Sequence, residues 1–262
     1  MINSDFLSSY IKKERQAKPI LIMAHLVLGY PDFKTNHEQV DVMVKAGADI
    51  IEMQIPFSEP IADGPVIAKA NQLSLARGTK IQDCLDFAQK VTTRHPKKAF
   101  IFMSYVNILF MRGIANIISQ SEKAGIKGWI VPDLPPEEAD VYLAECAKHK
   151  ISPIFIYAPT HSLARLKTLA NYSKGMIYAV ARKGITGGKT NFNQELIERL
   201  TIYRKIAKKP LAVGFGISQA EDVDFLIGKA DIVVIGSKLI EVLDEGGLTA
   251  LDLFLRKIRG NH

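Results

Sequence analysis

The sequence has little cysteine, no long apolar run and no concentration of one charge, and each shortage excludes a class of protein. Its two cysteines, Cys84 and Cys146, lie far apart without metal-ligand spacing, so no disulfide framework is expected. No apolar run approaches the length of a membrane-spanning helix, and the first residues lack the apolar core of a signal peptide. We therefore expect a cytoplasmic protein with no membrane partner.

Charge is modest and spread along the chain. The 34 basic residues exceed the 27 acidic ones and give a net charge of +7, but no basic arm or stripe stands out. This scatter is typical of a solvated surface and indicates no nucleic-acid partner, while leaving a mild preference for small anions. The 262 residues, 47% of them hydrophobic, suffice for a substantial core.

Short apolar runs alternate with amphipathic helical segments along the whole chain. Each run is bounded by Gly, Pro or Asp, as buried parallel strands are. We expect strands at 20–27, 49–55, 99–105, 128–132, 152–158, 175–180, 210–215 and 231–236. Because no linker interrupts this α/β pattern, it predicts one domain over residues 1–262, a (β/α)8 TIM barrel whose extra N-terminal helix, around 3–16, caps the bottom. An open, doubly wound sheet is the alternative.

Three of the helices have recognisable ends. Thr35 and Ser218 each stand three residues before a glutamate, which predicts capping boxes that open helices over 35–46 and 218–228. The last helical run, 237–259, has basic residues near its end, as the helix dipole favours.

The second expected strand contains a carboxylate. Alternation along the strand directs Ile51 and Met53 toward the outer helices and Glu52 and Gln54 toward the barrel interior. Burial disfavours the charged form of a carboxyl, and a carboxyl tuned in this way suits acid–base work near neutral pH. The alternative is a structural glutamate paired with a buried Arg or Lys, but the expected strands contain neither.

The loop after this strand carries a second acid, Asp63, among three prolines, Pro56, Pro60 and Pro65. Proline fixes φ, so the loop is stiff and holds Asp63 in a defined place over the barrel mouth. A carboxylate there can accept a hydrogen bond from a substrate N–H or O–H. The alternative is a common turn aspartate in "ADGP".

Small residues follow the seventh and eighth expected strands, in "GFGIS" (214–218) and at Gly236-Ser237. Backbone N–H groups at these helix starts form an anion site where such barrels hold phosphate, although plain turns would look similar. The Gly-rich, basic segment 181–193 is either a lid or a surface loop. Together these features indicate acid–base chemistry on a small phosphorylated molecule.

At these residues the sequence resembles the tryptophan synthase alpha chain family over essentially its whole length. "IEMQIPFSEPIADGPVI" is similar to the family signature, in which the strand glutamate and the "ADGP" aspartate are the catalytic carboxylates. "MSYVNILF", "VPDLPPEE", "ARKGITG", "VGFGIS" and "IGS" follow in the expected order.

The resemblance implies a lyase of tryptophan biosynthesis that cleaves indole-3-glycerol phosphate to indole and glyceraldehyde 3-phosphate, without metal or organic cofactor. It also implies a beta chain partner that carries pyridoxal phosphate and receives the indole in an α2β2 heterotetramer. The catalytic residues by this resemblance are Glu52 and Asp63. The resemblance also assigns contacts with the substrate to Tyr105, Tyr178, Thr186 and Phe215. It assigns binding of the phosphate group to Gly187, Gly216, Gly236 and Ser237.

The chain departs from the family pattern at several positions. His25 replaces an aromatic residue and is expected either to line the indole pocket or to be a hydrogen-bonded core histidine. Gln54 replaces a glycine and Glu59 an aspartate, on the segment expected to face the partner. Two other functions stay open: a catalytically weak activator of the beta chain, and another phosphate-binding barrel such as a sugar-phosphate isomerase or epimerase.

Overall fold

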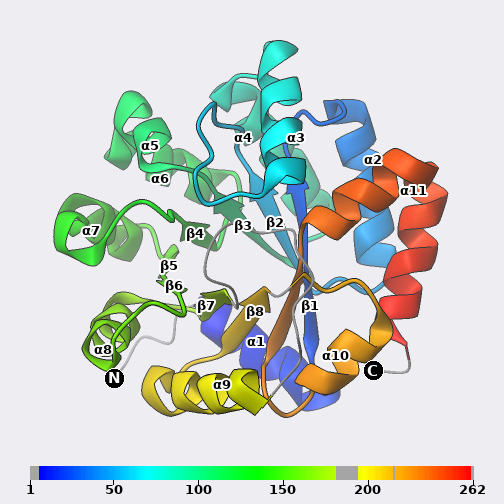
Figure 1. Ribbon diagram of the computed structural model, residues 1–262. Coiled ribbons are helices and arrows are strands. Elements are labelled where there is room, and N and C mark those ends of the chain that lie inside the picture. The colour runs from blue at the N-terminus through cyan, green and yellow to red at the C-terminus, as the bar shows by residue number, and fades with distance from the viewer. Residues whose placement is uncertain (1–5, 181–193, 215, 261–262) are drawn as a thin grey trace.

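The computed structural model describes residues 6–180, 194–214 and 216–260. Nine strands form one parallel sheet that curls into a barrel with helices around it (Figure 1). The strands are β1 (Leu21–Val27), β2 (Ile50–Gln54), β3 (Ala99–Met103), β4 (Gly128–Ile130), β5 (Ser152–Ile154), β6 (Ile156–Tyr157), β7 (Ile177–Val180), β8 (Leu211–Gly214) and β9 (Ile232–Ile235). Their order is β5-β4-β3-β2-β1-β9-β8-β7-β6, so strands consecutive in sequence are neighbours.

The barrel closes through a single segment of chain. The expected strand over 152–158 is split into β5 and β6, which are the two ends of the sheet order. Phe155 lies between them, and its N–H donates to Ser173 Oγ at 3.1 Å instead of a strand. Its carbonyl accepts from Tyr178 N at 3.1 Å, which keeps the segment against β7. Because β5 and β6 belong to one segment, the nine strands occupy eight positions around the barrel. This confirms the predicted (β/α)8 barrel and excludes the alternative of an open sheet.

Helices cover the outside and one end of the barrel, and none in the described part of the chain is long and apolar enough to cross a membrane. They are α1 (Phe6–Ala17), α2 (Phe33–Lys45), α3 (Pro65–Ala76), α4 (Ile81–Arg94), α5 (Val106–Arg112), α6 (Ile114–Lys123), the 3-10 turn η1 (Pro136–Glu138), α7 (Asp140–Lys148), α8 (Leu163–Tyr172), α9 (Gln194–Ala207), α10 (Ala220–Leu226) and α11 (Ser237–Arg259). The two cysteines are free, as expected, and both are buried.

Two of the predicted helix starts are wrong. Helix α2 begins at Phe33 because the Asp32 carboxylate, not Thr35, caps it by accepting from Thr35 N at 2.7 Å. Helix α10 begins after Gln219, whose capping box uses Asp222. Asp caps a helix at least as well as Thr does, which explains the earlier start of α2. At α10 the Asp222 carboxylate accepts from the N–H groups of Ser218 and Gln219, at 2.8 and 3.1 Å. Helix α11 spans the predicted residues, with a kink at Gly247.

The core has an inner and an outer layer, as alternation along parallel strands requires. Ile50 belongs to the inner layer, and Ile51 and Met53 to the outer layer beneath the helices. Leu7 and Ile11 of α1 join the inner layer, and α1 lies across one end of the barrel (Figure 1). The predicted cap at the barrel bottom is therefore confirmed.

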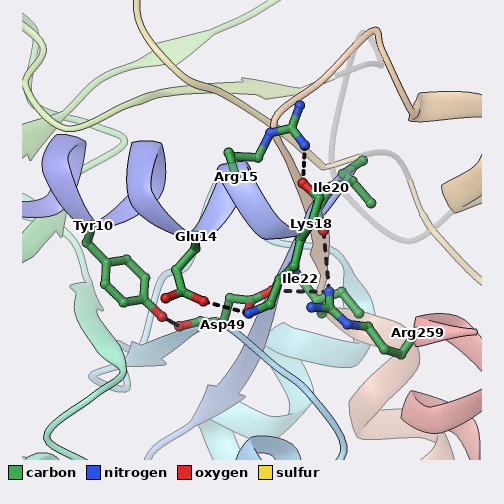
Figure 2. Close-up of polar contacts among 8 residues, drawn as sticks. All are labelled: Tyr10, Glu14, Arg15, Lys18, Ile20, Ile22, Asp49 and Arg259. Carbon is green, nitrogen blue, oxygen red and sulfur yellow. Dashed lines mark hydrogen bonds and ion pairs between the residues drawn. The ribbon is translucent and has the colours of Figure 1, made fainter. Parts of the chain in front are cut away.

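At the bottom of the barrel, one buried carboxylate contacts segments from near both ends of the chain (Figure 2). Asp49, directly before β2, is fully buried; its Oδ1 accepts from Lys18 Nζ at 2.5 Å. Its Oδ2 accepts from Ile22 N at 2.9 Å and from Arg259 Nη1 at 3.2 Å. Its carbonyl accepts from the Tyr10 hydroxyl at 2.7 Å. One residue thus joins α1, β1 and α11, with its charge balanced by two cations.

We expect Lys18→Met to lower the free energy of unfolding by about 1–2 kcal/mol, because Asp49 would remain buried with one cation fewer. Urea unfolding would measure the change. Lys12→Met, at an exposed position of α1, is the matched control. Equal stability of the two variants would contradict the role given to Lys18.

Candidate active site

Glu52 lies in the middle of β2 and points into the barrel. Its register partners are His25 on β1 and Ile101 on β3. The side chain is buried, and Oε2 has no hydrogen-bond partner among the described residues. Oε1 lies 3.5 Å from His25 Nδ1. The predicted inward direction is confirmed, but the basic group beside Glu52 is a histidine and not an Arg or Lys.

Asp63 comes from the loop between β2 and α3. Its Oδ2 accepts from Gln54 Nε2 at 2.7 Å and from the Tyr105 hydroxyl at 2.8 Å. Burial raises the pKa of Asp63, and the negative charge of Glu52 adds to this; the two hydrogen bonds and His25 oppose it without cancelling it. The pair of donors on one oxygen fixes the carboxylate in place.

Gln54 holds Asp63 in place, a role that its position in the sequence did not reveal. It was expected on a segment facing the partner, but its side chain is fully buried and contacts Asp63. Asn71 of α3 reinforces the loop, since its Oδ1 accepts from Phe57 N at 2.9 Å. The sequence did indicate that Gln54 faces inward, because it shares that side of β2 with Glu52. The sequence did not indicate the path of the loop, which brings Asp63 back over the strand and into contact with Gln54.

Two tyrosines border the carboxylates. Tyr105 precedes α5 and stacks on Phe57 with 5.1 Å between ring centroids; its hydroxyl binds Asp63. The pKa of Tyr178 on β7 is raised by burial and by the nearby negative charges of Glu52 and Asp63. A Cβ at Gly214 would lie 2.9 Å from the Tyr178 hydroxyl, so the glycine makes room for this ring. That Tyr178 contacts the substrate stays a prediction.

The glycines expected to hold phosphate lie at the same end of neighbouring strands. Gly214 of β8 pairs with Val234 of β9, so Gly216 and Gly236 follow adjacent strand ends. Gly216 has φ of +66°, a conformation that favours glycine. Gly236 precedes α11, whose first N–H groups have no side-chain cap from the residues that the structure describes. Ser237 is the first residue of that helix. The remaining predicted site residues lie outside the described residues: Thr186, Gly187 and Phe215.

The two carboxyl groups of the site differ in how many hydrogen bonds they make, and this difference suits them to different chemical roles. Within residues 6–180, 194–214 and 216–260, no three His, Cys, Asp or Glu side chains lie together so as to hold a metal ion. Glu52 has one carboxylate oxygen without a partner among the described residues, while Asp63 is held by its neighbours. One acid is thus available to exchange protons, and the other is suited to hold a fixed charge.

A sequence profile and individual sequence relatives indicate the same protein family. The sequence profile described as "Tryptophan synthase alpha chain" matches residues 11–253. A tryptophan synthase alpha chain from Syntrophotalea carbinolica is 51% identical, over 97% of this chain and 100% of the relative. One from Desulfotalea psychrophila is 49% identical, over 97% of this chain and 99% of the relative.

Solved structures agree with the sequence relatives. A chain of Mycobacterium tuberculosis tryptophan synthase superposes with a TM-score of 0.92 at 28% identity, covering 98% of each chain. Tryptophan synthase subunit alpha from Legionella pneumophila gives a TM-score of 0.90 at 28% identity, covering 97% of each. A chain of the tryptophan synthase complex from Pyrococcus furiosus gives 0.83 at 27% identity, covering 91% of this chain and 97% of that one. The chain described here belongs to the tryptophan synthase alpha chain family.

Proposed function

We propose that Glu52 and Asp63 carry out the lyase reaction of this family, the cleavage of indole-3-glycerol phosphate to indole and glyceraldehyde 3-phosphate. The feature that supports this best is the inward, buried Glu52, whose Oε2 has no partner in the described part of the chain, near a firmly held Asp63. A carboxyl in this setting can both give and take a proton, which the reaction requires.

Cleavage needs two proton transfers. Indole C3 gains a proton, and the hydroxyl on the adjacent side-chain carbon loses one as the carbon–carbon bond breaks and its electrons return to the ring. Glu52 gives the first proton and takes up the second, so it ends the cycle unchanged. Positive charge develops on the indole nitrogen between these steps. Asp63 stabilises that charge by accepting the N–H on Oδ1, since Oδ2 already serves Gln54 and Tyr105.

The phosphate would bind at the strand ends near Gly216, Gly236 and Ser237, with Gly187 from the segment outside the described residues. Uncapped N–H groups at the start of α11 support this placement. Binding of a group remote from the broken bond orients the substrate. Tyr105, Tyr178 and Phe215 would border the indole, and Thr186 would contact Asp63.

We expect Gly236→Val to weaken binding of glycerol 3-phosphate by about tenfold, the cost of losing one hydrogen bond to a charged group. A Cβ at Gly236 would make only an ordinary contact with Ile67, at 3.6 Å, so the fold should tolerate the change. Calorimetry would measure the affinity, with Thr249→Val at an exposed position of α11 as the control. Unchanged affinity would contradict the proposed phosphate site.

The partner proposed is a beta chain that carries pyridoxal phosphate and receives the indole in an α2β2 complex. Large apolar side chains exposed near the barrel mouth support such a surface: Ile61 in the Asp63 loop is 73% exposed, and Phe110 and Met111 of α5 are exposed too. The exposed Glu59 lies in the same loop. We further propose that the chain uses no cofactor of its own, forms one domain over residues 1–262 and works in the cytoplasm.

Indole release from indole-3-glycerol phosphate tests this function, measured for the chain alone and with saturating beta chain. We expect slow release alone and faster release in the complex, because the partner contacts the loop that carries Asp63. Absence of release by the chain in both conditions would contradict the proposal and favour a catalytically weak activator.

A further inference from the structure

Gln54 is the last residue of β2 and directly precedes the loop that carries Asp63. It is one of the positions at which the chain departs from the family pattern. The side chain is fully buried, and its Nε2 donates to Asp63 Oδ2 at 2.7 Å. A residue of the strand thus contacts a proposed catalytic acid of the loop.

Buried side chains hold this loop at both of its ends. At its start, Asn71 Oδ1 accepts from Phe57 N at 2.9 Å. At its end, the Tyr105 hydroxyl donates to Asp63 Oδ2 at 2.8 Å and accepts from the preceding backbone N–H at 3.1 Å. Gln54 Nε2 donates to Asp63 and lies 3.5 Å from Asn71 Oδ1. The Gln54 amide therefore lies between the two anchored ends of the loop.

The middle of the same loop faces outward. Ser58 and Glu59 are exposed, and Ile61 is 73% exposed. Because the anchoring contacts come from buried side chains, the chain itself sets the position of Asp63, with no contact needed on the outer side of the loop. A partner that packs on the exposed middle would restrain the same loop from outside.

The amide of Gln54 contributes little to the core itself. Its Oε1 is buried and has no hydrogen-bond partner among the residues that the structure describes, which lowers stability. A side chain that served only packing would need no amide. Burial raises the pKa of Asp63, and the hydrogen bond from Gln54 is the strongest influence that opposes this rise. The amide therefore favours the charged form of Asp63.

We propose that Gln54 is a positioning residue that holds Asp63 in its catalytic place in the chain without its partner, and that contact with the beta chain can replace this hold. The inference rests on the proposed function of Asp63. A carboxylate with one donor can turn about that contact, whereas a second donor on the same oxygen fixes its direction. Charge stabilisation depends on that direction, because the charge must already face the place where the positive charge develops.

The test is steady-state kinetics of indole release by Gln54→Met, measured for the chain alone and with saturating beta chain. Methionine has a similar length and no donor. For the chain alone, we expect kcat to fall about tenfold, the effect of losing one hydrogen bond to a charged group, with little change in KM. With the beta chain, the loss should shrink to about threefold or less, because a loop already restrained from outside gains less from the amide.

The same substitution in the Asp63→Asn background separates positioning from general damage to the site. Once the charge is gone, Gln54 has no charge to position, so Gln54→Met should lower kcat no further. Equal losses in the two backgrounds would overturn the inference, as would an unchanged kcat of Gln54→Met alone. A loss of the same size with and without the beta chain would overturn it too, since the partner would then not replace the hold.

Gln82→Met is the matched control, because Gln82 makes the same kind of contact on the exposed side of α4, from Nε2 to Asp86 Oδ1 at 2.9 Å. It should keep wild-type kinetics. Gln54→Ala, which demands no new packing, should show the same pattern as Gln54→Met and replaces it if thermal unfolding shows that methionine disturbs the core.

Asp63→Asn, measured alone, separates this inference from the proposed function. If that variant is fully active, the proposed function of Asp63 fails. If it is strongly impaired while both Gln54 variants keep the wild-type kcat, only the role of Gln54 fails.

Discussion

Glu52→Gln lowers kcat for indole release by roughly 100-fold or more, the usual contribution of a general acid–base group. The amide fills the same space on β2 and cannot exchange a proton. Because Oε2 has no partner among the described residues, the substitution removes no hydrogen bond there. We therefore expect thermal unfolding to change little.

Glu38→Gln, on the exposed side of α2, is the matched control for Glu52→Gln and should keep full activity. Near-normal turnover by Glu52→Gln would remove Glu52 from the mechanism. A large loss of thermal stability would mean that the carboxylate serves the fold, and the loss of rate could then not be assigned to chemistry.

Asp63→Asn lowers kcat by roughly 100-fold, equivalent to about 3 kcal/mol, with little change in KM. The remaining oxygen is expected to stay with the donors Gln54 and Tyr105, which turns the new NH₂ group toward the substrate. An N–H cannot accept the indole N–H, and no negative charge remains to stabilise the positive ring. The loss therefore falls on the transition state, where that charge exists.

Steady-state kinetics separate these effects, since loss of an interaction made only in the transition state lowers kcat at constant KM. Asp86→Asn, an exposed position on α4, is the control. An effect of Asp63→Asn confined to KM would show that Asp63 binds the substrate equally well in its ground state and transition state. The role of a charge stabiliser would then be wrong.

The strands and the direction of Glu52 could be predicted because they follow from local patterns. Each strand is a short apolar run with turn residues beside it, and alternation alone sets which side chains face inward. The same alternation placed Gln54 inward. Its contact with Asp63 could not be predicted, because it depends on how the eight intervening residues fold back over the strand.

Contacts between segments that are distant in the sequence could not be predicted, for the same reason. The approach of His25 to Glu52 needs the register between β1 and β2, and a slip of one residue would reverse the direction of a side chain. The interruption at Phe155 depends on Ser173, 18 residues further along the chain. The Asp49 contacts join three segments, with Arg259 210 residues away.

The central claim is that Glu52 moves a proton at indole C3. Exchange of the C3 hydrogen of indole with D₂O, followed by NMR in the presence of glycerol 3-phosphate, tests that step without cleavage and without the partner. The wild-type chain and the Glu38→Gln control should exchange this hydrogen faster than buffer does. We expect Glu52→Gln to exchange it at the buffer rate; exchange by Glu52→Gln as fast as by the wild type would contradict the account.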